Sequence, residues 1–131
     1  MVSIDEMQEM LDDIAETLPK EFYTQLNGGI ILMPQAKRHQ RTGAEGLYIM
    51  GEYYRGGNLG RYIAIYYGSF MRVHGHLTKE RLAERLTSTL KHEFRHHLES
   101  LAGERGLEVE DEQFLAEYLR RQARGKEREQ Q

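Results

Sequence analysis

The chain has 131 residues, enough for one domain with a modest hydrophobic core. No apolar run approaches the roughly 20 residues that a membrane-spanning helix needs, so we expect no membrane association. The chain contains no cysteine, which excludes disulfides and thiolate zinc sites, and a net charge of −3 gives no general reason to expect nucleic-acid binding. We therefore expect a single cytoplasmic domain over residues 1–120 and a charged, flexible tail over 121–131.

The N-terminal segment predicts an amphipathic helix. Ser3 and Glu6 have the spacing of a capping box, in which each side chain satisfies a backbone N–H of the other residue. Apolar residues follow at helical spacing until Pro19, namely Met7, Met10, Leu11, Ile14 and Leu18. Further on, the apolar run Ile30–Met33 predicts a short strand that Pro34 ends.

The middle of the chain predicts a small sheet. Residues 35–46 form a polar loop, and two strands are expected over 47–54 and 61–70. The glycine-rich segment 55–60 between them is typical of a hairpin turn. Helices before and after these strands indicate an α+β domain.

The most informative stretch lies on a long helix that Thr78 caps and that runs to about Ala102. It contains the motif H-E-x-x-H, formed by His92, Glu93 and His96. Residues four apart lie on the same face of a helix, so the two imidazoles point to one spot and can bind one zinc ion. Glu93 lies one residue further round the helix, where it can reach a water molecule without being a ligand.

The remaining residues of this helix separate into two faces. An apolar stripe faces the core and consists of Leu82, Ala83, Leu86, Leu90, Phe94, Leu98 and Leu101. His92, His96 and Glu99 fall on roughly the opposite side. His97 falls within the apolar stripe, so we interpret it as a structural histidine that is hydrogen-bonded at the core edge.

Two segments carry a family resemblance: Tyr66 to Arg72, and the helical run His92-Glu93-Phe94-Arg95-His96-His97. With the order of elements, they make the chain from about Ile30 to Leu119 resemble the small bacterial zincin family, described as metallopeptidases with a minimal zincin fold. The resemblance implies a small antiparallel or mixed sheet, which we expect to be mostly antiparallel, packed against an N-terminal helix and the active-site helix. It also implies a third, acidic metal ligand in a D-E-x-x-L-type segment, which matches Asp111 to Leu115 and makes Asp111 the candidate.

Two other carboxylates remain alternatives for the third ligand. Commoner members of the family have glycine where this chain has Glu99, and a shorter connection to the acidic ligand. Glu99 lies seven residues beyond His92, about 10 Å along the helix axis, which suits a hydrogen-bond partner of a histidine better than a ligand. Our order of preference is Asp111, then Glu104, then Glu99.

These features predict a zinc-dependent peptidase in which Glu93 acts as general base. The strand 61–70 is expected at the edge of the cleft, where a peptide or protein substrate could add as a further strand. Tyr66, Tyr67, Arg72 and His74 are candidates for stabilising the oxyanion.

Two alternatives stay open at this stage. The first is a non-catalytic module that keeps the metal and binds a peptide or protein in the groove. The second is nucleic-acid binding through the basic loop Lys37–Arg41 together with Lys91 and Arg95. Net acidity and the lack of interleaved aromatic residues count against it, so no nucleic-acid partner is expected. The oligomeric state is not predicted.

Overall fold

The computed structural model describes residues 1–39 and 47–104. Their helices are α1 (Ile4–Thr17), the short 3-10 helix η1 (Lys20–Tyr23), α2 (Tyr67–His74) and α3 (Lys79–Glu104). Their strands are β1 (Gly29–Met33), β2 (Lys37–Arg38), β3 (Tyr48–Ile49), β4 (Gly51–Tyr54) and β5 (Tyr62–Tyr66). The predicted tail over 121–131 and the end of the predicted domain lie outside these residues.

The main sheet has three strands in the order β1-β5-β4. The central strand β5 pairs parallel with β1 and antiparallel with β4, where Tyr54 lies opposite Tyr62. The sheet is therefore mixed, with one parallel and one antiparallel pair, and the family resemblance allowed an antiparallel or a mixed sheet. The short strands β2 and β3 pair antiparallel as a separate two-stranded ribbon.

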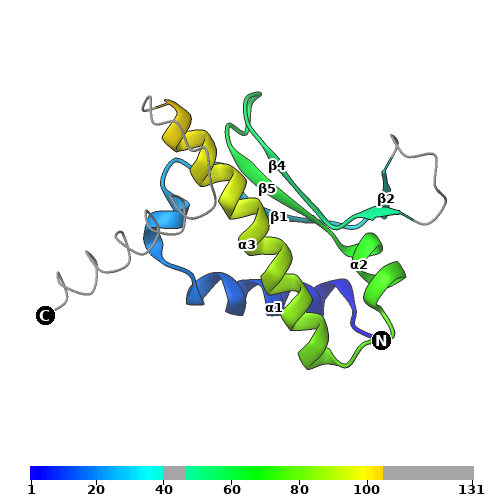
Figure 1. Cartoon of the computed structure of the whole chain (residues 1–131). Helices are drawn as coiled ribbons and strands as arrows, with labels where there is room; N and C mark the ends of the chain where they lie inside the picture. Colours follow the sequence, from blue (N-terminus) through cyan, green and yellow to red (C-terminus); the bar gives the residue numbers. More distant parts are fainter. Residues whose placement is uncertain (40–46, 105–131) are drawn as a thin grey trace, which may run out of the picture.

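One face of the main sheet is covered by helix. Figure 1 shows α3 crossing the sheet, where it packs on β4 and β5, and α1 packs against α3 in turn. Side chains from all of these elements form one core, which includes Met7, Leu11, Ile63, Ile65, Phe70, Leu86, Leu90 and Phe94. Two layers of helix and sheet around one core confirm the α+β class.

Both predicted helix starts are confirmed by their caps. The Glu6 N–H donates to Ser3 Oγ at 3.1 Å, and the Ser3 N–H donates to Glu6 Oε1 at 3.2 Å, which completes the capping box. At α3, the Arg81 N–H donates to Thr78 Oγ1 at 3.3 Å. The long helix thus begins where its sequence predicts, and this start fixes which α3 residues face the sheet.

The predicted strand 61–70 is wrong in its second half, because β5 ends at Tyr66 and α2 begins at Tyr67. Gly68 explains why the chain turns here. A Cβ on Gly68 would lie 2.4 Å from the backbone nitrogen of Ala36, so only glycine lets α2 pack this closely on the segment before β2. The buried Ser69 then accepts a hydrogen bond from the Lys37 N–H at 2.8 Å.

The predicted role of residues 61–70 at the cleft edge is also wrong. Strand β5 is the middle strand, and its hydrogen-bonding groups on both sides are taken by β1 and β4. No further strand can pair with it. Strand β4 ends the sheet on the side that faces the candidate site described below. No helix within residues 1–39 and 47–104 is long and apolar enough to cross a bilayer.

Candidate active site between α3 and β4

The H-E-x-x-H motif lies on α3 as its spacing predicts. His92 Nε2 and His96 Nε2 are 3.2 Å apart, and the two ring centres are 4.7 Å apart. Two nitrogens bound to one tetrahedral zinc at about 2.0–2.1 Å would lie about 3.3 Å apart. The histidine pair therefore has the spacing that a shared zinc ion requires.

The surroundings of His92 favour the neutral imidazole that binds a metal. Partial burial lowers the pKa of His92, and the neighbouring His96 and Arg95 lower it further. A lowered pKa keeps the imidazole neutral, the form that binds a metal. Glu99 Oε2 lies 3.9 Å from His96 Nδ1, while its other oxygen accepts from Arg95 Nε at 3.0 Å. Glu99 is thus placed to orient His96 from the side opposite the metal position.

Glu93 lies beside this pair but faces a different environment. It is only 6% exposed, and burial raises the pKa of its carboxyl to about 7, with the negative charge of Glu52 as the second cause. No cation of residues 1–39 or 47–104 contributes to this shift. A carboxyl with a pKa near neutrality can both take up and release a proton at physiological pH, as a general base must.

A groove runs between α3 and the end strand β4. Its volume is about 600 Å³, and both histidines and Glu93 line it together with Gly51, Glu52, Tyr53, Arg55, Glu99 and Ser100. Gly51 allows the strand to approach the helix, since a Cβ there would lie 3.1 Å from side-chain atoms of Ile65 and of Thr89. The groove is of the size that binds small molecules or a few residues of a peptide.

The buried His97 fixes both β4 and the turn that follows η1 to α3, and its burial agrees with its place in the apolar stripe. Its Nε2 lies 2.7 Å from the carbonyl of Thr24, which can only accept, so Nε2 carries the proton. Its Nδ1 then accepts from the Tyr53 hydroxyl at 2.8 Å, and that hydroxyl accepts from Arg61 Nη1 at 2.7 Å. Burial lowers the pKa of His97, so this histidine stays neutral and its two hydrogen bonds persist near neutral pH.

The third metal ligand is not found among the described residues. No group of three histidine, aspartate or glutamate side chains in residues 1–39 and 47–104 is arranged to hold a metal. Glu99 is near His96 but does not complete such a group. Asp111 and the side chain of Glu104 lie outside the described part of the chain, so both predictions stay untested.

None of the four predicted oxyanion residues lines the groove. Tyr66 and Arg72 line a pocket formed by other residues, and Tyr67 donates to the carbonyl of Val2 at 2.7 Å. His74 is the last residue of α2, where its ring packs against Phe70. Tyr67, Arg72 and His74 belong to α2, which begins within the segment 61–70 that was predicted as a strand.

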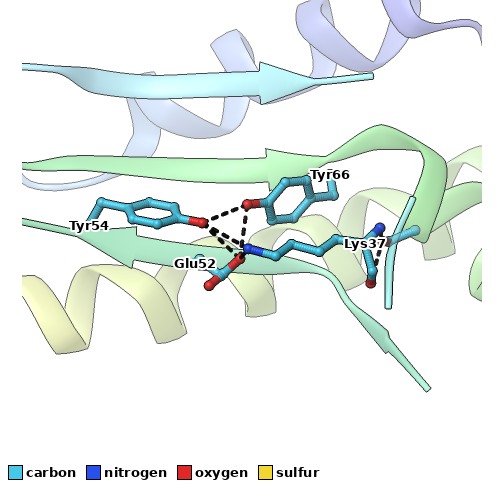
Figure 2. A network of polar contacts seen from close by, with 5 residues as sticks. Lys37, Glu52, Tyr54 and Tyr66 are labelled. Carbon is cyan, nitrogen blue, oxygen red and sulfur yellow. Dashed lines mark hydrogen bonds and ion pairs between the residues drawn. The ribbon is translucent and has the colours of Figure 1, made fainter. Parts of the chain in front are cut away.

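Sequence reasoning also missed a polar network on β4 and β5. Figure 2 shows the Glu52 carboxylate meeting the Lys37 ammonium and the hydroxyls of Tyr54 and Tyr66. Both Tyr–Glu distances are 2.9 Å. Pairing the two strands outward from the predicted hairpin turn would have placed Tyr54 opposite Tyr62 and Glu52 opposite Ala64. Lys37 belongs to β2, so pairing the strands of the hairpin gives no indication that it meets Glu52.

Comparison with known proteins gives a family but no activity. No protein-family model and no curated protein matches the chain. A solved structure does match: a conserved hypothetical protein from Thermo thermophilus is 36% identical, with a TM-score of 0.69. The match covers 78% of this chain and 99% of that one. The chain belongs to the family of this hypothetical protein. The relationship supports the α+β fold and leaves the chemistry to be argued from the site.

Proposed function

We propose that the protein is a zinc-dependent metallopeptidase whose metal is held by His92 and His96. The observation that carries the proposal is the convergence of the two Nε2 atoms to 3.2 Å beside a buried glutamate, within a groove. Zinc in that position would polarise a peptide carbonyl and lower the pKa of water. A third ligand is still needed, and Asp111 remains the first candidate, ahead of Glu104.

The roles of the chain's own residues follow from their surroundings. Glu93 would take a proton from the attacking water and pass it to the leaving amine, which its raised pKa permits. Glu99 would hold the orientation of His96 through Nδ1. His97 and Tyr53 would keep β4 at a fixed distance from α3, and so keep the groove open to substrate.

The substrate we propose is an extended segment of a peptide or protein. It would lie in the groove beside β4, the strand at this edge of the sheet. Strand β4 thus takes the role that the sequence assigned to residues 61–70. The Arg55 side chain at one end of the groove donates to Ser100 Oγ at 3.0 Å and could meet a substrate carbonyl or carboxylate. We also propose that the protein acts in the cytoplasm, in keeping with a chain that has no cysteine.

A second function uses the same groove without catalysis. The described residues bring His92 and His96 together but complete no ligand set, which also suits a module that binds a peptide or protein and retains the metal for structure. Zinc at one equivalent per chain with no cleavage across a diverse peptide library would favour this alternative. Cleavage that depends on Glu93 would favour the peptidase.

The variant Glu93→Gln tests the proposal. It keeps the shape of the side chain and removes the base, so we expect zinc binding to persist and peptide cleavage to fall by about 10²–10⁴-fold. Turnover of fluorogenic peptide mixtures and zinc content would be measured on the same preparations. The control is Glu84→Gln, an exposed glutamate of the same helix outside the groove, which should cleave like the wild type. Undiminished cleavage by Glu93→Gln would contradict the assigned role.

A further inference from the structure

The face of the main sheet turned away from α3 carries a second pocket. Because side chains alternate along a strand, Ile63 and Ile65 of β5 enter the core while Tyr62 and Tyr66 point to the other face. The pocket there has a volume of about 560 Å³ and is bounded by the ribbon β2-β3 and by α2. It shares neither a histidine nor Glu93 with the groove.

Two arginines of the pocket lining lie near the ring of one tyrosine, Tyr48. The guanidinium carbon of Arg38 lies 5.9 Å from the ring centre of Tyr48, and that of Arg72 lies 5.8 Å from the same centre. Arg72 Nη1 also lies 3.4 Å from the Tyr48 hydroxyl. Arg38 and Arg72 lower the pKa of the Tyr48 phenol, as expected where positive charge gathers.

Within the described part of the chain, no carboxylate pairs with either arginine. The pocket lining contains no aspartate or glutamate, and residues 1–39 and 47–104 provide no ion pair for Arg38 or Arg72. Lys37, the third cation of the lining, is already matched by Glu52, as Figure 2 shows. The local charge is therefore positive in a chain whose net charge is −3. Two positive charges near one ring, with no counter-charge among residues 1–39 and 47–104, favour an anion from outside the chain.

The apolar and aromatic walls of the pocket indicate which kind of group is attached to such an anion. Tyr54 and Tyr62 stack on one another with ring centres 4.8 Å apart, and Met33 adds an apolar contact beside them. The volume exceeds that of an inorganic ion and falls in the range of sites for small organic ligands, about 300–1,000 Å³. Guanidinium groups bind planar or tetrahedral oxyanions through paired N–H donors. A neutral ligand forms weaker hydrogen bonds with these donors.

We infer that this pocket binds a small organic oxyanion, a carboxylate or a phosphate monoester attached to a planar ring. Arg38 and Arg72 bind the oxyanion, and the tyrosine and methionine wall packs against the ring. The site is separate from the groove, so its occupancy does not depend on zinc or on peptide cleavage.

The test uses the full chain and three probes that share a benzene ring: phenyl phosphate, phenylacetate and the neutral benzyl alcohol. Each is titrated into isotope-labelled protein, and dissociation constants are taken from amide chemical shifts. We expect saturable shifts at residues 37, 38, 48 and 72 with at least one anion, weaker binding at high salt, and no saturation with benzyl alcohol. The tighter of the two anions identifies the oxyanion class.

Two variants make the result specific. Arg72→Gln removes one charged donor and should weaken binding about tenfold, the equivalent of about 1.4 kcal/mol. Arg81→Gln removes the same charge from an exposed position on α3 outside the pocket and should leave the affinity unchanged. Circular dichroism would show that both variants are folded. The inference is overturned if neither anion saturates, if benzyl alcohol binds equally well, or if both variants weaken binding to the same extent.

Discussion

Two glutamates near the groove, Glu93 on α3 and Glu52 on β4, have pKa values that are shifted in opposite directions. Burial raises the pKa of Glu93 to about 7, and no cation in the described part of the chain offsets it. Burial also acts to raise the pKa of Glu52, but hydrogen bonds from Lys37, Tyr54 and Tyr66 outweigh it, and the pKa is lowered. One carboxyl is held ready to exchange a proton, and the other is fixed as a permanent charge.

The difference fits the role of base proposed for Glu93 and a structural role for Glu52. A buried carboxylate that lacks a counter-charge costs stability, and perturbed pKa values are common at functional sites, which supports the proposed role of Glu93. A carboxylate that accepts several hydrogen bonds stabilises the sheet surface and has no proton to give. Environments that push two pKa values apart are typical of sites that run acid–base chemistry near neutral pH.

The largest expected effect is the change in stability when Glu93 is replaced in metal-free protein. Its pKa is higher in the folded state, about 7, than the ordinary 4.5, so ionised Glu93 destabilises the fold above pH 7 and has no effect below about pH 4.5. Glu93→Gln removes that penalty and should raise the free energy of unfolding at pH 8 by up to about 3 kcal/mol. Urea unfolding after treatment with a chelator would measure it. A gain that persists unchanged at pH 4 would contradict this origin.

Glu52→Gln should act in the opposite direction and by less. Because the folded pKa of Glu52 lies below 4.5, its ion pair stabilises the protein above that pH, and the stabilisation is lost as pH falls through the folded pKa. Lys37 is 38% exposed, so solvent screening limits the expected loss at pH 7 to about 1 kcal/mol. The same unfolding measurement applies. Stability that is unchanged at pH 7 would show that the network contributes nothing.

The smallest expected effect links the two glutamates. The charge of Glu52 is the second cause of the raised pKa of Glu93, so Glu52→Gln should lower the Glu93 pKa by a fraction of a unit. Carbon-13 NMR of the Glu93 carboxyl would follow its titration. Glu84→Gln removes an exposed charge of α3 and serves as the control. It should leave the pKa of Glu93 unchanged. An equal shift of the Glu93 pKa in both variants would mean that the shift follows from net charge and not from Glu52 itself.

Much of this arrangement could be predicted from local sequence signals. The caps at Ser3 and Thr78 fixed the starts of two helices, and helical periodicity separated His97 from the pair His92 and His96. The turn from β5 into α2 could not be predicted, because the aromatic and apolar residues continue to Phe70 and the decisive contact is Gly68 against Ala36. The ion pair of Glu52 escaped prediction for the same reason, since Lys37 comes from a separate ribbon.

The central claim is that His92 and His96 bind one metal ion between them. The most direct measurement is the zinc content per chain of purified protein after equilibration with zinc, by elemental analysis. We predict about one zinc per chain for the wild type, none for His92→Ala, and one for the control His76→Ala, which changes an exposed histidine outside the groove. Zinc that is absent from the wild type, or retained in full by His92→Ala, would contradict the claim.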